Sequence, residues 1–518
     1  MRPFVRHIAG LLLFPALCVM AASASFGAAA GTGQPGASTA TSFPMAKQGL
    51  FENRTGSSIY APPGKSAGNS NILGGYTLTG IIAGAYAKQS EETGKNIPES
   101  TAGLYGNRLL ILDGRVEGSV HGALGEGRIV ADSNRLAVDG RYAFVNGKPP
   151  LPFPIVISGS IAHTVRHNSL DIRSGTIRGD AAGAYGRESS SGNSLFIKGG
   201  AIEGTALGGG SLEGQSSGNL VFMTGGKVRR LTGGAALKNG AASNNSVFFS
   251  GGATSDITGG FSAKNDASGN SVFISGGAIA PASGQDGPAF VSGGISPEGS
   301  ATGNSISLSG RPMLRNCIFY GGSAGQNAAS EDDEELIRGN VLTLDETYQG
   351  PIPVMRNFES LVINSRNVFI PPPSYTPPST LKRLVLEGRL LFTGNQPGSL
   401  VLDKTHYAGD KGIVEIRLHA GKKIRADKIS IEHGSLVLSP VRIYLSNPEK
   451  LKTGERVLIM EIENASSMRG VNRRHALVWS EQPRLSEEEA EKYEVRLVLS
   501  LGGADKDHWM IEKRLRTP

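Results

Sequence analysis

Hydrophobic and polar residues alternate in short stretches of this chain, and the stretches recur. Residues 268–279, SGNSVFISGGAI, place Val272 and Ile274 on one side of an extended segment. Alternation with a period of two predicts a β-strand, and the Gly-Asn and Gly-Gly pairs around it predict turns. Residues 192–202, GNSLFIKGGAI, carry nearly the same pattern. The chain therefore contains a repeated unit built on one short strand.

An asparagine opens each copy of the unit. The successive intervals are 27, 34, 25, 26, 26, 25, 34 and 36 residues, and the three longest contain the insertions KPPLPFP, APASGQDGP and SEDDEEL. A fixed period that is interrupted by loop-like insertions predicts a solenoid. The copies begin at Asn107, Asn134, Asn168, Asn193, Asn219, Asn245, Asn270, Asn304 and Asn340.

The interior of the repeat favours strands over helices. It offers two or three short alternating stretches and no helical spacing, which predicts an all-β fold: a right-handed single-stranded parallel β-helix with a C-terminal β-rich cap. Equal positions would then stack about 4.8 Å apart, so the asparagines predict an amide ladder. Paired glycines are expected to turn the chain where φ is positive and a Cβ would clash. They are Gly199, Gly200, Gly225, Gly226, Gly251, Gly252, Gly276 and Gly277.

The two ends of the chain differ from the repeats. Residues 1–24 predict a signal peptide, because a basic start precedes an apolar stretch and Ala22 and Ala24 supply the small residues of a cleavage site after Ala24. Residues 25–69 form a low-complexity N-terminal segment or cap, and 70–325 hold the repeats. An acidic and Pro-rich transition with a degenerate coil follows at 326–379, and the cap spans 380–518. No later stretch has the roughly 20 apolar residues of a membrane span.

Composition narrows the function classes. Lys and Arg are scattered, the net charge is +7, and 6% of residues are aromatic, so we expect no nucleic-acid partner. Cys18 would leave with the signal peptide, so Cys317 stands alone without a disulfide and is interpreted as a core residue. Glycine, at 72 of 518 residues, fits a fold with many tight corners.

Acidic residues are the first candidates for chemistry, because β-helices also serve as polysaccharide-cleaving enzymes. Such enzymes need carboxylates, or a carboxylate with Arg or Lys, on one sheet face. The acids of the repeats do not recur at one position, so we predict no catalytic residues. Glu203 and Arg229-Arg230 fall at similar places in successive repeats and are interpreted as a solvated outer face. The acids are Asp171, Asp180, Glu203, Glu213, Asp256 and Asp266.

Metal and cofactor sites are not predicted either. His163 and His167, in HTVRH, would share one face of a strand or helix, but further ligands are not identifiable and the Glu of a zinc-protease motif is missing. The acidic run 331–335 is interpreted as a solvated loop, and GQDGPAF at 284–290 lacks the recurrence of calcium-binding repeats. We therefore expect no metal and no cofactor.

The repeats resemble a known family. GNSVFISGGAI is similar to the passenger-associated repeats of Gram-negative autotransporters, and LKTGERVLIMEIENASSMRG resembles a segment late in such passengers. YEVRLVLSLGGADKDHWMIEKRL resembles the hairpin that closes the passenger before the translocator. The resemblance implies a β-helical passenger. Family members continue into a β-barrel translocator, whereas this sequence stops at RLRTP. Three explanations stay open: a truncated or split copy, a translocator on a separate chain, or a passenger-like protein that is exported differently.

These observations predict an exported, non-enzymatic surface or secreted protein that takes part in adhesion or cell-surface interaction. The chain would be outer membrane-associated or extracellular, with the periplasm as a further location. Its partners would be a separate outer-membrane translocator and unidentified ligands on host cells, matrix or bacterial surfaces. Two alternatives stay open: a carbohydrate-active β-helix enzyme, and a truncated autotransporter remnant. The segments 146–154, 280–290 and 326–338, which break the period, are the expected carriers of recognition.

Overall fold

The structure is a computed structural model, and its described residues fall into two compact units. One unit takes the described residues up to Asn304 together with 312–317 and 322–324, and the other takes 305–311, 318–321 and the residues from Arg338 on. The described residues are 59–60, 67–68, 70–74, 76–88, 103–141, 143–147, 155–324, 338–365, 367–370, 383–386, 390–392, 398–401, 413–419, 429–431, 434–437, 441–462, 477–479, 482–502 and 506–516.

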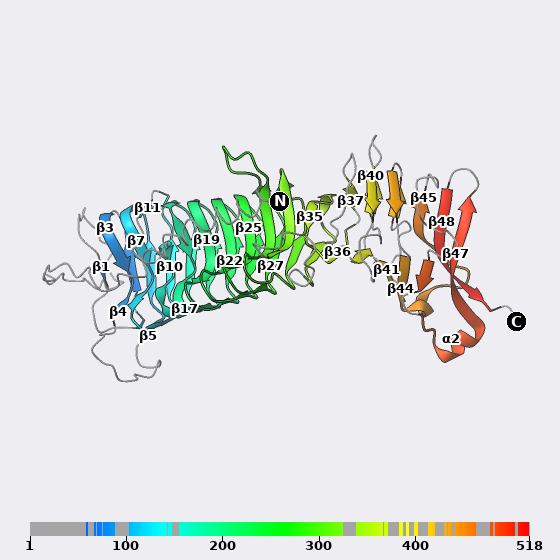
Figure 1. The fold of residues 1–518 in the computed structure, drawn as a ribbon, viewed down its shortest axis with the longest axis horizontal. Coiled ribbons are helices and arrows are strands. Elements are labelled where there is room, and N and C mark those ends of the chain that lie inside the picture. The colour runs from blue at the N-terminus through cyan, green and yellow to red at the C-terminus, as the bar shows by residue number, and fades with distance from the viewer. Residues whose placement is uncertain are drawn as a thin grey trace. The chain divides into compact units, whose positions relative to one another are not determined.

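Sheet 1 of the first unit contains the strand that follows each asparagine, and all its strands run parallel (Figure 1). Leu195, Val221, Val247 and Val272 are register partners in successive strands. All four are fully buried, so the alternation read from the sequence selects the core side. The strands, in sheet order, are β2 (Ser70–Leu73), β6 (Arg108–Ile111), β10 (Arg135–Val138), β14 (Ser169–Ile172), β18 (Ser194–Ile197), β21 (Leu220–Met223), β24 (Ser246–Phe249) and β27 (Ser271–Ile274).

Sheet 2 receives the chain after each strand of sheet 1. Its strands are also parallel, and each pairs with the equivalent strand of the next repeat, so the chain returns to each sheet one position further on. The prediction of an all-β fold with large parallel sheets is confirmed. The strands used below are β3 (Tyr76–Ala83), β7 (Gly114–His121), β11 (Ala143–Asn146), β13 (Ile161–Arg166), β15 (Thr176–Arg178), β16 (Asp180–Ala182), β19 (Ala201–Ser211), β22 (Lys227–Ala236), β25 (Ala253–Ser262), β28 (Ala278–Ile279), β29 (Ala289–Ser296) and β31 (Met313–Leu314).

The corners of the repeat explain its glycines. The second residue of each Gly-Gly pair has a positive φ, as at Gly252 with 87°. The first has a different reason: a Cβ on Gly251 would lie 2.3 Å from the carbonyl oxygen of Thr224 in the preceding repeat. The second glycine is restricted in both ways, since a Cβ on Gly252 would lie 2.5 Å from the carbonyl oxygen of Gly226. Close stacking therefore applies to both glycines of a pair, as the sequence predicted, whereas positive φ applies only to the second.

The second unit continues parallel pairing and then changes direction. Sheet 1 continues in parallel as far as β46 (Leu477–Trp479), and a separate seven-stranded sheet is parallel as far as β45 (Arg456–Ile462). Among the described residues, antiparallel pairs join β45 to β48 (Lys506–Leu515) and β48 to β47 (Tyr493–Gly502). The segment SEEEAEKY forms a short helix, α2 (Glu487–Lys492), which is capped by Ser486. Parallel stacking thus reaches well into the region that the sequence predicted as a cap.

Several sequence predictions lie outside the described residues. These are the signal peptide with Ala22 and Ala24, most of the segment 25–69, the insertion 148–154, the acidic run 331–335 and the Pro-rich stretch 371–382. Within the part of the chain that is described, no helix has the length and apolar character needed to cross a bilayer.

Candidate functional site

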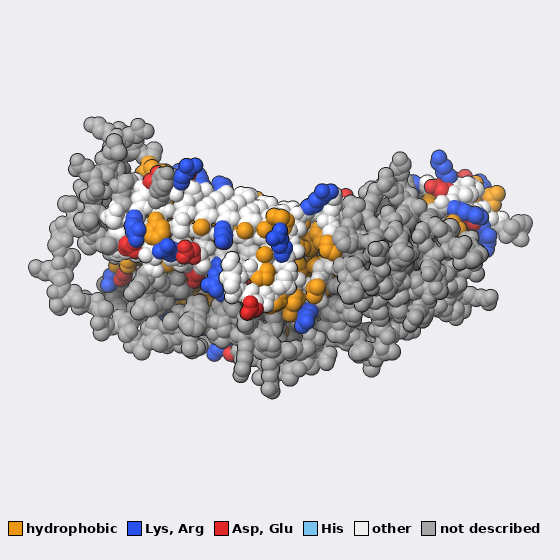
Figure 2. Space-filling view, turned by 90° about the horizontal axis from the view of Figure 1, so that it is seen from above, with side chains coloured by type: hydrophobic (Ala, Val, Ile, Leu, Met, Phe, Trp, Pro, Cys, Tyr) orange, Lys and Arg blue, Asp and Glu red, His pale blue; other side chains and the backbone are white. Residues whose placement is uncertain are grey.

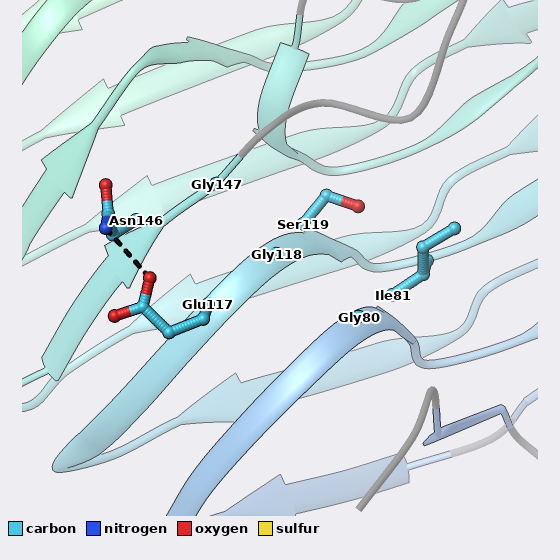
Figure 3. Close-up of a pocket in the computed structure, with 7 residues that line it drawn as sticks. All are labelled: Gly80, Ile81, Glu117, Gly118, Ser119, Asn146 and Gly147. Atoms are coloured by element: carbon cyan, nitrogen blue, oxygen red, sulfur yellow. Dashed lines mark hydrogen bonds between the residues drawn. The ribbon is translucent and has the colours of Figure 1, made fainter.

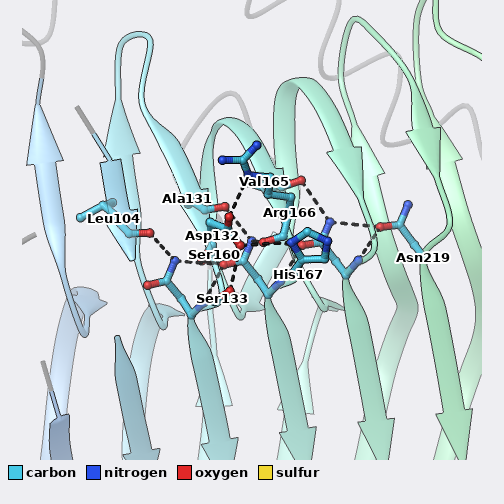
Figure 4. A network of polar contacts seen from close by, with 12 residues as sticks. Leu104, Ala131, Asp132, Ser133, Ser160, Val165, Arg166, His167 and Asn219 are labelled. Carbon is cyan, nitrogen blue, oxygen red and sulfur yellow. Dashed lines mark hydrogen bonds and ion pairs between the residues drawn. The ribbon is translucent and has the colours of Figure 1, made fainter. Parts of the chain in front are cut away.

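The asparagines of the first unit form one continuous side-chain ladder. The Nδ2 of each donates to the Oδ1 of the next, at 2.7 to 3.1 Å, from Asn107 to Asn304, and Figure 4 shows part of this ladder, ending at Asn219. All of these residues are fully buried, as is Asn340 in the second unit, whose Nδ2 donates to the carbonyl of Asn357.

Each ladder amide is saturated by its neighbours. The Oδ1 of Asn245 accepts from both the backbone N–H and the Nδ2 of Asn219, and its own Nδ2 also donates to the carbonyl of Ser216. A Cβ on Gly234 would lie 2.2 Å from the same amide oxygen, so only glycine fits beside it. The hydrogen-bonding groups of the ladder amides are therefore satisfied within the fold, and none of them faces a ligand.

A left-handed residue precedes every ladder asparagine. Glycine fills this position in most repeats, as at Gly218 with φ 61°, but Ser133, His167 and Asn244 adopt it with φ of 58°, 54° and 55°. Because β13 ends at Arg166, His167 lies beyond the strand. The predicted sharing of one face by His163 and His167 is therefore wrong, and no group of three metal-ligating side chains occurs among the described residues.

Asp132 contacts three polar side chains near His167 (Figure 4). It accepts from Ser133 Oγ at 2.9 Å and from Arg166 Nε at 2.8 Å, and His167 Nδ1 lies 3.2 Å away. Burial alone would raise the pKa of Asp132, but these hydrogen bonds together lower it. The serine bonds to the carboxylate and not to the imidazole, so this Ser, His and Asp set lacks the order of a catalytic triad.

Charged side chains do gather on the outer side of sheet 2, in two rows that cross its strands. Register places Arg178, Glu203 and Arg229 side by side in the first row, and Arg178 Nε lies 3.5 Å from Glu203. The second row contains Asp180, Thr205, Arg230 and Asp256. We call these the charged rows. Figure 2 shows a face on which acidic and basic side chains lie beside one another amid small and polar surface.

The second row corrects a prediction, since Asp180 and Asp256 do share one repeat position. A β-bulge hides this in the sequence: Glu203 and Gly204 of β19 together face the single residue Arg229 of β22. Because of this extra residue, Asp180 lies 12 residues after its ladder asparagine, Asn168, whereas Asp256 lies 11 residues after Asn245. Spacing along the sequence therefore places the two acids at different repeat positions.

Half-burial sets the electrostatics of the second row. Burial raises the pKa of both Asp180 and Asp256, although Thr205 N–H and Phe290 N–H bond to them and nearby arginines oppose the shift. Burial likewise lowers the pKa of Arg230, whose Nε lies 3.8 Å from Asp256. The pKa values of the two carboxyl groups are thus shifted in the same direction. Their strands are three positions apart in the sheet, which corresponds to about 14 Å. Glycosidase pairs are about 5 to 9.5 Å apart, so this pair does not fit that chemistry.

A surface pocket of about 560 Å³ lies at the N-terminal end of sheet 2. Figure 3 shows Glu117 meeting Asn146 from the neighbouring strand, with Asn146 Nδ2 donating at 2.8 Å. Next to the pair, the guanidiniums of Arg115 and Arg178 lie 4.8 and 5.0 Å from the ring centre of Phe144. Glu117 also accepts a hydrogen bond from Arg115, so the polar side chains that line the pocket are bonded to one another. The pocket is lined by Gly80, Ile81, Glu117, Gly118, Ser119, Asn146 and Gly147.

His121 is fully buried behind this pocket. Its Nε2 lies 3.0 Å from Ser119 Oγ and its Nδ1 lies 2.9 Å from Ser158 Oγ. Burial lowers the pKa of His121 from 6.5 to about 3, so the ring is neutral at physiological pH. Ser119 is 1% exposed, which closes the serine to a substrate in this state.

An aromatic stack lies on the outer side of sheet 1. Successive ring centres of Phe196, Phe222, Phe248 and Phe273 are 6.4, 6.1 and 4.5 Å apart, and Phe222 and Phe273 are exposed. Ring contacts of this kind stabilise neighbouring strands. The sequence contains a signal for this stack, because phenylalanine stands three residues after the asparagine in four consecutive repeats.

The remaining candidates lie apart from one another. Asp171 joins Arg173 and Lys198 on sheet 1, Glu213 lies 3.6 Å from Arg187, and Asp266 bonds to Ser300. Cys317 is half-buried, and burial raises the pKa of its thiol to about 12, so the thiol is unreactive at neutral pH.

Comparison with known proteins finds no matching family model, no matching curated protein and no matching solved structure. The charged rows are therefore the candidate site on geometry alone.

Proposed function

We propose that this chain is a right-handed parallel β-helix of the autotransporter-passenger type, exported to the cell surface or beyond, which acts there by binding and not by catalysis. The observation that supports this most is the buried asparagine ladder, in which one side chain per repeat bonds to the same side chain in the next. Such a ladder makes each repeat the template of the next, and it leaves the outer faces free to vary.

The outer faces support binding in preference to a reaction. Their charged groups are distributed in rows over many strands, and the acids of the second row are too far apart for paired-carboxylate hydrolysis. The resemblance of the repeats and the C-terminal hairpin to passenger sequences supports export, together with the predicted signal peptide. Adhesion or another cell-surface contact is the role that we propose for these faces.

Localisation on intact cells tests the proposal. Antibody labelling and protease treatment of cells that produce the protein should detect it outside the outer membrane or in the medium. A chain that becomes accessible only after lysis, in the cytoplasmic fraction, would overturn export. Release of sugar from a panel of polysaccharides, lost on replacement of Asp180 or Asp256, would support the carbohydrate-active alternative instead.

A further inference from the structure

Two cations project from β22 towards solvent. Lys227 and Arg229 are exposed, and Val228 between them is buried in the core, so both point to the outer side of sheet 2. Ion pairs in the charged rows join Arg178 to Glu203 and Arg230 to Asp256. Among the described residues Lys227 and Arg229 form no ion pair, and Arg229 acts on Asp180 and Asp256 only through its field.

A third cation lies in line with Arg229. β22, β25, β28 and β31 are neighbours in register, with Val228, Thr254, Ile279 and Leu314 in one row. Arg315, which follows Leu314, is therefore three strand positions from Arg229, about 14 Å. It is exposed, and its backbone N–H is bound to the carbonyl of Ile279.

Small side chains occupy the register positions between these cations, and the exposed Asp286 lies in the insertion that follows β28. Register places Ala253 and Ala278 between Lys227 and Met313, and Ser255 follows Arg229 in its own row. Met313 is 56% exposed and offers an apolar contact. We call this surface the cation face: Lys227, Arg229, Met313 and Arg315 around a floor of small side chains.

We propose that the cation face binds an extended polyanionic glycan, with a uronate or sulfate group at each end of the face and the sugar rings over the small residues. The inference rests on the proposed binding function and deepens it. Charge complementarity supports it, since the charged side chains that define this face, Lys227, Arg229 and Arg315, are all positive. A second copy of the chain that docked through the same face would present the same sign of charge and be repelled.

Other polyanions fit the face less well. A peptide that adds as a strand needs a free sheet edge, whereas β22 and β25 are paired on both sides. A nucleic acid presents phosphates at short intervals and favours a dense basic stripe. Three cations spread across four strands suit the sparser charges of an acidic polysaccharide.

Binding of the full chain to immobilised glycans tests the inference. Polygalacturonate supplies carboxylates, dextran sulfate supplies sulfates, and dextran is the uncharged control. The double variant Lys227→Glu with Arg229→Glu, and the single variant Arg315→Glu, should each weaken binding to a charged glycan about tenfold or more. Lys264→Glu reverses an exposed charge at a turn after β25 and should change binding less than about twofold. Whichever charged glycan binds identifies the anionic group.

Two outcomes would overturn the inference: equal loss in the Lys264 variant, which means unspecific attraction, or unchanged binding in the cation-face variants. Preferential binding of duplex DNA, displaced by no glycan, would assign the face to nucleic acid instead. Circular dichroism of each variant separates lost binding from lost fold. If the chain is exposed at the cell surface but does not bind glycans, this inference is wrong and the proposed function stands. If the chain binds glycans but is confined to the cytoplasm, the proposed function is wrong.

Discussion

At the scale of single residues, the ladder asparagine does three tasks that no other side chain of its length combines. It accepts two hydrogen bonds on Oδ1, donates to the next amide, and donates to a backbone carbonyl, all without charge. Serine is too short for the ladder, and aspartate lacks the donor and would bury a charge. The same residue type therefore recurs wherever a repeat meets its neighbour at this corner.

Asn245→Ala should lower the free energy of unfolding by about 3 kcal/mol, because the backbone N–H and Nδ2 of Asn219 lose their acceptor in a fully buried site. Urea unfolding followed by circular dichroism measures the change. Ser246→Ala, one residue on and half-buried on the outer side, serves as the control and should cost less than about 0.5 kcal/mol. Equal effects of the two substitutions would contradict the ladder's energetic role.

His167→Gly should raise stability by about 0.5 kcal/mol. Glycine relieves the left-handed backbone at φ 54°, and two effects offset part of the gain: the greater freedom of the unfolded chain and the loss of the exposed contact between His167 and Asp132. The reciprocal change Gly218→Ala, at the same position of a later repeat and with open space for a methyl group, should cost about 1 kcal/mol. Thermal and urea unfolding of both variants measure the two changes in stability, which should have opposite signs. Changes of the same sign would refute the explanation from backbone conformation.

At the scale of elements, α2 is attached to the terminal antiparallel sheet by a buried ion pair. Lys513 of β48 has a side chain that is 4% exposed, and its Nζ lies 2.8 Å from Glu489 Oε1 of α2 and 3.3 Å from the carbonyl of Glu449. The same ammonium lies 5.1 Å from the ring centre of Tyr493. A six-residue helix is too short to be stable alone, so this contact holds it in place.

Glu489→Ala should destabilise the chain by about 3 kcal/mol, since it leaves the charge of Lys513 buried and unpaired. Glu488→Ala removes only an exposed pair with Lys492 on the same helix and should cost less than about 0.5 kcal/mol. Hydrogen exchange of β47 and β48 amides is the direct measurement, because the helix packs beside them. Equal protection in the two variants would show that the pair contributes nothing.

At the scale of the whole molecule, acid stability reflects the neutral histidine in the core. The pKa of His121 is lowered to about 3 in the folded state against 6.5 when exposed, so below pH 6.5 the unfolded chain binds a proton that the folded chain refuses. Its contribution is complete above pH 6.5 and is lost as the pH falls towards 3. Asp180 and Asp256 act with the opposite sign, because their raised pKa values let the folded state take up protons first.

His121→Gln should remove this acid dependence. Below pH 6.5, the stability difference between wild type and variant should shift in favour of the variant by about 1.4 kcal/mol per pH unit. Urea unfolding at intervals from pH 7.5 to 4.5 measures the slope. Parallel pH profiles for the two proteins would mean that another group controls acid unfolding.

The repeat itself was predictable because its signals are local. Asparagine, alternation and Gly-Gly recur within each unit, and a parallel stack brings equal positions together without long-range choices. The shared position of Asp180 and Asp256 was not predictable, because a one-residue bulge in β19 changes the distance along the sequence from the ladder asparagine to this row. His121 gave no signal either, since its partners Ser119 and Ser158 come from two different strands.

The sequence by itself determined the strand period, the ladder asparagines and the all-β class, because each follows from spacing within a repeat. Tertiary structure alone decided which outer side chains became neighbours: it paired Glu203 with Arg178, whereas Lys227, Arg229 and Arg315 form no ion pair with any residue that the structure describes. The physical reason is register. Neighbours across a sheet are set by strand pairing and bulges, which the order of residues along one strand does not contain.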